Sequence, residues 1–158
     1  MALDYEQLRE FLVESKQHTY AAQGDEASVL PQLVGSKQLE YRRGEFFYRD
    51  IYFGMSFFAG QETVQQHDRP VWSMVYSGGI TQPERSWEDT AAIYAFLRQA
   101  LMQVDTVTVY RGPISYEQDR YLYRNEYEGS IDSFRGQEQI WLGGELVYEL
   151  VYNGGTLR

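Results

Sequence analysis

The chain contains no cysteine and only two histidines, His18 and His67. Disulfide bonds, thiolate catalysis and cysteine-ligated zinc are therefore excluded, and two histidines do not make a histidine-rich metal cluster. Lysine is also scarce, at residues 16 and 37 only, and no run of basic residues offers the stripe that binds duplex nucleic acid or an anionic membrane. We expect no metal and no cofactor, and neither nucleic acid nor a membrane as a partner.

Long hydrophobic stretches are missing as well. No apolar run approaches the about 18 residues of a membrane-spanning helix, and residues 1–20 carry charges where a signal peptide is apolar. The formal net charge is −9, from 14 Lys+Arg against 23 Asp+Glu. These features predict an acidic, soluble and cytoplasmic protein. At 158 residues the chain is expected to fold as a single domain, 1–158, that buries about two-thirds of its unfolded surface.

Aromatic residues are abundant instead, at 16% of the chain with 14 tyrosines. Tyrosine combines a large apolar area with a hydrogen-bonding hydroxyl, which suits binding pockets and interfaces. The same composition is typical of a Tyr-rich antiparallel sheet, because aromatic side chains favour strands. Composition alone leaves both interpretations open.

The stretch from residue 48 to 80 recurs, with small changes, from residue 123 to 157. One residue is inserted in the second copy. The corresponding pairs include Tyr48 and Tyr123, Tyr52 and Tyr127, Glu62 and Glu138, Tyr76 and Tyr152, and upstream Phe11-Leu12 and Phe96-Leu97. The repeat predicts two related halves, residues 1–80 and 81–158.

Each half is predicted to be one helix followed by strands. Asp4 caps the first helix, which ends before His18, and Ser86 caps the second, which runs to about Gln103. Strands are predicted at 39–42, 45–53, 60–66 and 71–76, and at 121–128, 136–142 and 145–152, with 21–37 as a loop. The predicted fold is α+β: an internally duplicated helix plus antiparallel β-meander, with two pseudo-symmetric halves sharing one core.

The strand predicted at 45–53 matches its counterpart at 121–128 best. Along each of them, successive side chains point to opposite faces of the sheet. One face carries Tyr48, Asp50 and Tyr52, and the corresponding face of the second half carries Tyr123, Asn125 and Tyr127. Burying an unpaired carboxylate or amide costs about 1 to 3 kcal/mol. Asp50 and Asn125 therefore either orient a polar ligand in an aromatic pocket or are satisfied by tyrosine hydroxyls and backbone amides of the sheet. The candidate ligand-binding residues are Tyr48, Asp50, Tyr52, Trp72, Tyr76, Tyr123, Asn125 and Tyr127.

The triplet Gly-Gln-Glu occurs twice, at residues 60–62 and 136–138. Its glutamates, Glu62 and Glu138, are candidates for an acid/base pair of a hydrolase if their carboxylates face one cleft. The competing interpretation is that they are solvated strand-edge residues paired with arginine. The chain has no Gly-x-Ser-x-Gly, no phosphate-binding loop ending in Lys-Ser/Thr and no His-Glu-x-x-His. We therefore assign no catalytic residue and favour a protein that is not an enzyme.

Several short motifs are spread over nearly the whole chain. They are Phe11-Leu12-Val13, Thr19-Tyr20-Ala21, Gly35-Ser36-Lys37 with Leu39-Glu40-Tyr41, Tyr48-Arg49-Asp50 with Tyr52 and Gly54, Phe58-Ala59-Gly60-Gln61-Glu62, and Pro70-Val71-Trp72 with Met74, Tyr76 and Gly78. In these motifs the chain resembles an uncharacterised bacterial family, the domain of unknown function numbered fifty-six-eighty. Members occur alone or fused behind a helix-turn-helix module, so the resemblance implies a link to regulation. It implies no activity and no catalytic residue.

These observations predict a non-catalytic binding module whose aromatic sheet faces form a cleft for a small molecule or a peptide. One alternative is a protein-interaction or inhibitor module that uses an acidic, Tyr-rich surface on a basic partner. The other is an acid/base hydrolase. An enclosed aromatic cavity favours the first hypothesis, an exposed aromatic patch the second, and two carboxylates in one cleft the third.

Overall fold

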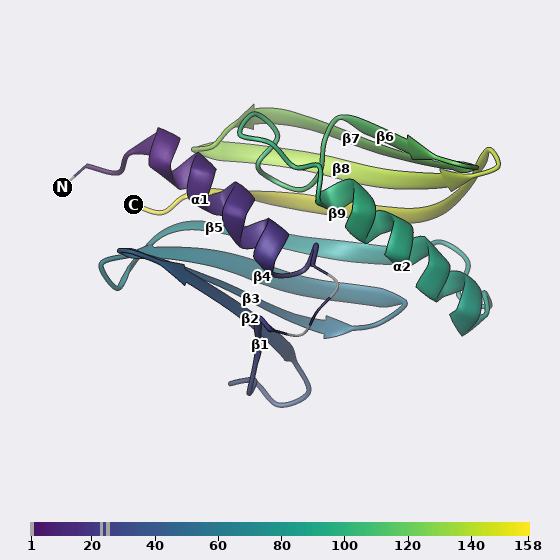
Figure 1. Cartoon of the computed structure of the whole chain (residues 1–158), viewed down its shortest axis with the longest axis horizontal. Helices are drawn as coiled ribbons and strands as arrows, with labels where there is room; N and C mark the ends of the chain where they lie inside the picture. The colour runs from purple at the N-terminus through teal and green to yellow at the C-terminus, as the bar shows by residue number, and fades with distance from the viewer. Residues whose placement is uncertain (1, 23, 25) are drawn as a thin grey trace.

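The computed structural model describes residues 2–22, 24 and 26–158 (Figure 1). In this part of the chain, two helices pack on one nine-stranded antiparallel sheet, which confirms the α+β prediction. The helices are α1 (Tyr5–His18) and α2 (Trp87–Leu101). The strands are β1 (Ser28–Val29), β2 (Lys37–Arg43), β3 (Phe46–Gly54), β4 (Phe57–Gln66), β5 (Arg69–Ile80), β6 (Ser115–Gln118), β7 (Tyr121–Ser130), β8 (Ser133–Leu142) and β9 (Glu145–Thr156).

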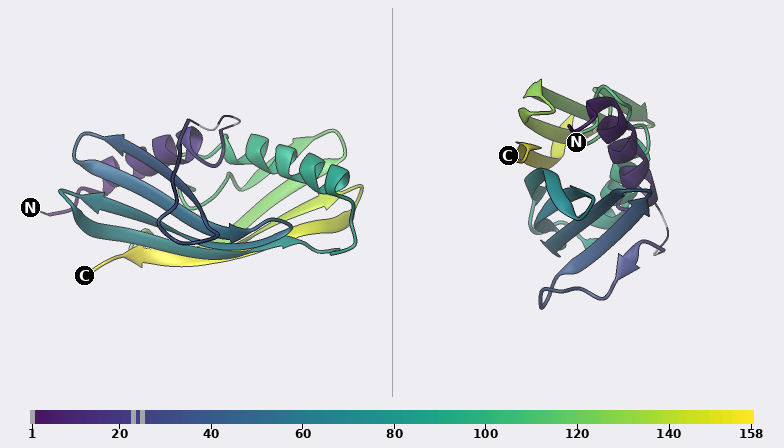
Figure 2. Two further views of the ribbon diagram at one scale, coloured as in Figure 1. Left: turned by 90° about the horizontal axis from the view of Figure 1, so that it is seen from below. Right: turned by 90° about the vertical axis from the view of Figure 1, so that its left-hand side faces the viewer.

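Both helices begin at the predicted caps and lie on the concave face of the curved sheet (Figure 2). Asp4 Oδ1 accepts hydrogen bonds from the backbone N–H groups of Glu6 and Gln7 at 2.9 and 3.2 Å. Ser86 Oγ accepts one from Asp89 N–H at 3.1 Å. Helix α1 includes His18, and α2 ends two residues before the predicted Gln103, a difference usual at fraying helix ends. Neither described helix is long and apolar enough to cross a membrane.

Strands β5 and β9 lie side by side at the centre of the sheet, whose order is β1-β2-β3-β4-β5-β9-β8-β7-β6. Tyr76 pairs with Tyr152 at the middle of this seam. The strands of residues 1–80 extend from the seam in one direction and those of residues 81–158 in the other (Figure 1). Buried apolar side chains from both directions and both helices form one hydrophobic cluster between sheet and helices.

The sequence prediction missed two short strands and made six of the other seven too short, β5 and β9 by four residues or more. Strand β1 lies in the segment predicted as a loop, of which residues 23 and 25 lie outside the described residues, and β6 lies in a segment left unassigned. Strands of two and four residues are too short to show a period. Strands β5 and β9 continue through Gly78 and Gly154, where a Cβ would lie 2.2 Å from a carbonyl oxygen of a neighbouring strand. These glycines allow close approach of strands and do not end them.

Candidate ligand-binding site

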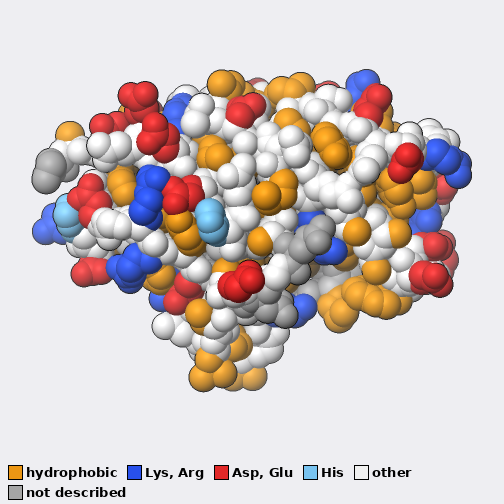
Figure 3. Space-filling model, viewed as in Figure 1, with side chains coloured by type: hydrophobic (Ala, Val, Ile, Leu, Met, Phe, Trp, Pro, Cys, Tyr) orange, Lys and Arg blue, Asp and Glu red, His pale blue; other side chains and the backbone are white. Residues whose placement is uncertain are grey.

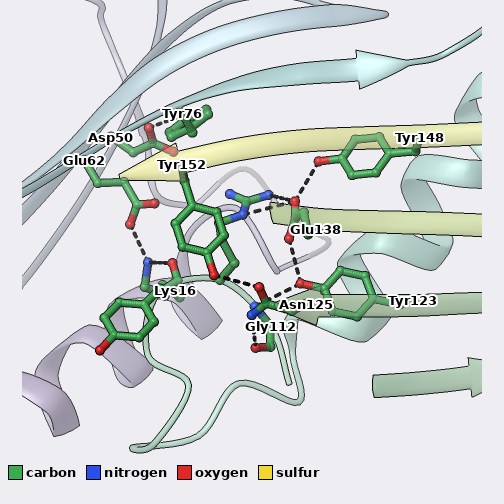
Figure 4. Close-up of polar contacts among 12 residues, drawn as sticks. Lys16, Asp50, Glu62, Tyr76, Gly112, Tyr123, Asn125, Glu138, Tyr148 and Tyr152 are labelled. Atoms are coloured by element: carbon green, nitrogen blue, oxygen red, sulfur yellow. Dashed lines mark hydrogen bonds and ion pairs between the residues drawn. The ribbon is translucent and has the colours of Figure 1, made fainter. Parts of the chain in front are cut away.

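Charged side chains lie inside the core, between the sheet and the helices (Figure 4). Glu62 on β4 is completely buried, and its Oε1 accepts hydrogen bonds from Lys16 Nζ at 2.7 Å and from the Tyr48 hydroxyl at 2.6 Å. Lys16, on the buried stripe of α1, also donates to the carbonyl oxygen of Tyr110 at 2.8 Å. A buried carboxylate needs such partners, because desolvation costs several kcal/mol per ion.

Glu138 on β8 is equally buried and has a fuller set of partners. Arg111 donates to its Oε1 through Nε and Nη2 at 3.1 and 2.6 Å, and Tyr148 donates to the same oxygen at 2.7 Å. Tyr123 donates to Oε2 at 2.6 Å. The interpretation of Glu62 and Glu138 as solvated strand-edge residues is therefore wrong, but the expected pairing with arginine is found at Glu138. Both carboxylates are also inaccessible to a substrate, which removes the geometric support for an acid/base hydrolase.

Asp50 on β3 is satisfied by a tyrosine that lies two strands away. The Tyr76 hydroxyl, on β5, donates a hydrogen bond of 2.6 Å to Asp50 Oδ1 (Figure 4). Between them lies Gly60 on β4, where a Cβ would be 2.4 Å from the Tyr76 hydroxyl oxygen. The glycine of the first Gly-Gln-Glu triplet thus makes room for the tyrosine.

Asn125 on β7 has the corresponding arrangement. Tyr152 donates to Asn125 Oδ1 at 2.6 Å across Gly136, where a Cβ would lie 2.2 Å from the tyrosine ring. The Asn125 amide also donates to the carbonyl oxygen of Gly112 at 3.0 Å, so both ends of this side chain are hydrogen-bonded. The interpretation in which tyrosine hydroxyls satisfy Asp50 and Asn125 is therefore confirmed.

The environment of Asp50 changes its acidity. Burial and the nearby Glu62 carboxylate raise the pKa of Asp50 from 3.8 to about 7, against the opposing effects of the Tyr76 hydrogen bond and the positive charges of Arg111 and Lys16. Near neutral pH this side chain is therefore present both as an acid and as a carboxylate. It can donate as well as accept a hydrogen bond.

Asp50 lines a cavity of about 250 Å³ between the sheet and α2. Tyr52, Phe58 and Tyr76 form the sheet wall, and Tyr94, Leu97 and Leu101 form the helix wall. Two lining side chains, Met55 and Trp87, are more than half exposed at 56% and 59%, and mark where the cavity opens. Hydrophobic side chains gather on this side of the molecule, below α2 (Figure 3). The cavity is thus mainly aromatic and aliphatic, with a buried acid in its lining.

Basic side chains and an unpaired hydroxyl complete the lining. Lys37, Arg98 and Arg111 all line the cavity. The Arg111 guanidinium lies 5.0 Å from the ring centroid of Tyr20 and 5.5 Å from that of Tyr76. The Tyr20 hydroxyl oxygen is buried and has no hydrogen-bond partner among the described residues. An unsatisfied buried hydroxyl costs about 1 to 3 kcal/mol, so a polar group that reaches Tyr20 would recover that free energy.

The helix-free face of the sheet carries a larger but shallower hollow, of about 670 Å³. Exposed Val75 and Val151 lie in its lining, and the buried ion pairs of Glu62 and Glu138 do not. A ligand site needs an enclosed surface with a few converging polar groups. The smaller cavity beside Asp50 meets that description, and we take it as the candidate site.

The structure brings together three of the eight candidate ligand-binding residues, because Asp50, Tyr52 and Tyr76 all line the cavity. The other five lie elsewhere. Tyr48, Trp72, Tyr123 and Asn125 are completely buried in the core, and Tyr127 packs against the ring of Tyr110. Of the second set, only Tyr127 shares a hollow with the first set, because Tyr127 and Tyr76 both line the shallow hollow on the helix-free face.

Sequence reasoning missed ten residues that reach the cavity from β2, from β4, from loops and from α2. They are Tyr20, Lys37, Met55, Phe58, Trp87, Tyr94, Leu97, Arg98, Leu101 and Arg111. A signal was available for Lys16, the buried partner of Glu62, since it follows Leu12 by four residues on the apolar stripe of α1. Arg111 lies in a segment without any period, and nothing in the sequence marks it.

Tyrosine contributes little to the surface. Of the 14 tyrosines, all of which the structure describes, only Tyr5 is exposed, at 44%. The others are buried or half-buried, and several of their hydroxyls bind the buried carboxylates. The Tyr-rich surface that the interaction-module hypothesis needs is therefore not found among the described residues.

Fold and site together define an α+β domain with a charged core and a small aromatic cavity beside it. The sequence profile of the family described as Domain of unknown function (DUF5680) matches residues 50–157, more than half of the chain. The chain belongs to this family, which confirms the predicted resemblance. No curated protein and no solved structure matches the chain.

Proposed function

We propose that the protein is a non-catalytic binding module that holds a small molecule in the cavity between β3–β5 and α2. One comparison within the molecule carries the proposal. In the second half, Tyr127, Phe134 and Tyr152 form an aromatic cage around Tyr110, whose ring centroid lies 4.9, 4.1 and 6.5 Å from theirs. In the first half, the corresponding side chains, Tyr52, Phe58 and Tyr76, line a cavity.

The two cages have the same framework. Gly60 pairs with Tyr52 on one side and with Tyr76 on the other, and Gly136 pairs in the same way with Tyr127 and Tyr152. Phe58 lies 6.0 Å from Tyr76, and Phe134 lies 6.2 Å from Tyr152. This agreement supports the further inference that residues 1–80 and 81–158 are copies of one ancestral unit. On that view, the ring of Tyr110, which fills the cage of the second half, indicates the kind of group that the cavity of the first half accepts.

The size of the cavity favours a small molecule over a peptide. An enclosed apolar cavity of about 150 Å³ is enough for benzene. At about 250 Å³ the present cavity accommodates one substituted ring, whereas an extended peptide needs a groove along a sheet edge or a helix. The cavity walls are mostly apolar, with Asp50 and Tyr20 supplying the few polar groups that fix an orientation.

The test uses para-fluorobenzyl alcohol, an uncharged single-ring probe, followed by fluorine NMR. Met55→Trp narrows the opening of the cavity, and Met102→Trp is the matched control, because Met102 is 39% exposed and does not line this cavity. We expect the probe signal to broaden with the unaltered protein and with Met102→Trp, and to stay sharp with Met55→Trp. Absence of broadening with the unaltered protein, or equal broadening with both variants, would overturn the proposal.

A further inference from the structure

Building on this proposed function, we infer that the ligand is a small aromatic anion. Its ring is placed against Tyr52, Phe58 and Tyr76, and its anionic group, a carboxylate or a group of similar charge, is held by Lys37 and Arg98. The inference rests on which ring occupies the second cage and on which charges in the cavity lining have partners.

The ring follows from Tyr110. Its side chain is almost completely buried and is tilted against Tyr127 and Phe134, at interplanar angles of 59° and 30°. Aromatic rings prefer such tilted or offset contacts over a flat sandwich, because their faces and edges carry opposite partial charge. Tyr52 and Phe58 keep a comparable edge-on geometry, at 69°, around the open cavity. A planar ring is therefore the shape that this cage accommodates.

The charge follows from the basic residues. Arg111 and Lys16 are each neutralised by a buried glutamate. Lys37 and Arg98 line the cavity, and neither has an ion-pair partner among the acidic residues that the structure describes. Two uncompensated positive charges beside one opening are unusual in a chain of net charge −9. Such a pair attracts and holds an anion.

An organic cation is the competing occupant, because aromatic rings beside a carboxylate bind ammonium groups. Here the rings are already paired with cations of the protein. Lys37 Nζ lies 5.9 Å from the ring centroid of Tyr52, and the Arg111 guanidinium lies over Tyr20 and Tyr76. A cationic ligand would meet like charge at both places. The electrostatics of the cavity therefore favour the anion.

The test compares three probes that differ at one substituent: para-fluorobenzoate, para-fluorobenzyl alcohol and para-fluorobenzylamine. Their dissociation constants are measured by fluorine NMR titration at low ionic strength. We expect the benzoate to bind about tenfold more tightly than the alcohol, as a hydrogen bond to a charged group allows, and the amine to bind most weakly. The benzoate advantage should shrink as salt is added.

Two variants test whether Lys37 and Arg98 hold the anionic group of the ligand. Lys37→Met and Arg98→Met should each reduce the ratio of benzoate to alcohol affinity toward one. Arg69→Met is the matched control, because Arg69 is exposed at the β4–β5 turn, lies outside the cavity lining and also has no described ion-pair partner. It removes the same unit of charge and should keep the ratio near ten, apart from a small long-range effect. Circular dichroism spectra confirm that all three variants are folded.

The outcomes separate the inference from the function on which it rests. If Met55→Trp abolishes binding but the alcohol or the amine binds as tightly as the benzoate, the proposed function stands and the anionic ligand is rejected. An unchanged affinity ratio in both Lys37→Met and Arg98→Met rejects it as well. If the alcohol does not bind to the unaltered protein, or binds equally to Met55→Trp and Met102→Trp, the proposed function itself fails.

Discussion

The Tyr76 hydroxyl lies 2.6 Å from Asp50 Oδ1 because Gly60, on the strand between them, has no side chain in the way. This contact holds a carboxyl group inside an aromatic core and beside a second buried carboxylate, Glu62. Burial and Glu62 together raise the pKa of Asp50 to about 7. A carboxyl group whose pKa is higher in the folded state than in the unfolded state makes the free energy of unfolding depend on pH.

Asp50→Asn should therefore change how stability depends on pH. Above about pH 4, the carboxyl group of unfolded Asp50 is ionised, whereas the folded one keeps its proton until about pH 7. The free energy of unfolding thus falls as the pH rises between these values. Asparagine retains an acceptor for Tyr76 and does not titrate. Urea unfolding at pH 5 and pH 8 should show the variant gaining about 2 to 3 kcal/mol relative to the unaltered protein over this interval.

Asp132→Asn is the matched control for this experiment. Asp132 is half-buried, and hydrogen bonds from Tyr5 and Thr156 lower its pKa. Its contribution to stability is lost only as the pH falls through that lowered value, so the variant should run parallel to the unaltered protein from pH 5 to 8. If the stability of Asp50→Asn also changes with pH in parallel with that of the unaltered protein, Asp50 does not titrate as described.

The glycines of the two Gly-Gln-Glu triplets should not tolerate alanine. The three atoms nearest to a Cβ at Gly136 all belong to Tyr152, the closest at 2.2 Å. Gly136→Ala should cost about 1 to 3 kcal/mol by overpacking, and much less in a Tyr152→Leu background. At Gly154 the closest atom is the carbonyl oxygen of Ser73, so the cost of Gly154→Ala should be the same in both backgrounds. Urea unfolding of the two double-mutant cycles measures the coupling of Gly136 and of Gly154 to Tyr152. If the costs of Gly136→Ala and Tyr152→Leu simply add, the prediction is wrong.

Lys16 should be needed for stability only while its ion-pair partner, Glu62, is charged. Lys16→Met leaves Glu62 in the core without a cation, which should cost about 3 to 5 kcal/mol. Adding Glu62→Gln removes the uncompensated charge, so the double variant should recover most of this loss. Chemical unfolding of both variants checks the expectation. A double variant no more stable than Lys16→Met alone would show that lost packing, and not charge, is responsible.

The parts of the fold that depend on neighbouring residues could be predicted from the sequence. Asp4 and Ser86 cap the helices that follow them, and the alternation around Asp50 identifies the buried face of β3. The partner of Lys16 could not be predicted in the same way. Glu62 is 46 residues distant in sequence, and only the packing of α1 on the sheet brings the two together.

The candidate site was only partly predictable for a related reason. The repeat predicts that Tyr52 corresponds to Tyr127 and Tyr76 to Tyr152, and it gives both sets the same role. Which cage is filled depends on Tyr110, in a segment between α2 and β6 that has no helical or strand period. Lys37 and Arg98 reach the cavity from β2 and α2, so that their common position depends on tertiary structure alone.

Removing the ring of Tyr110 should open a second cavity of the same kind. Tyr110 is 2% exposed and lies against Tyr127, Phe134 and Tyr152, so Tyr110→Ala should cost about 3 to 5 kcal/mol. Phenol at millimolar concentration should restore part of this loss by filling the space, seen as a rise in Tm. The measurement is made in a Met55→Trp background, which narrows the opening of the first cavity. Tyr116→Ala, which removes a half-buried ring stacked on Phe96, is the control and should gain nothing from phenol. Equal rises in Tm for both variants would show that phenol does not act by filling the space left by Tyr110, and would contradict the prediction.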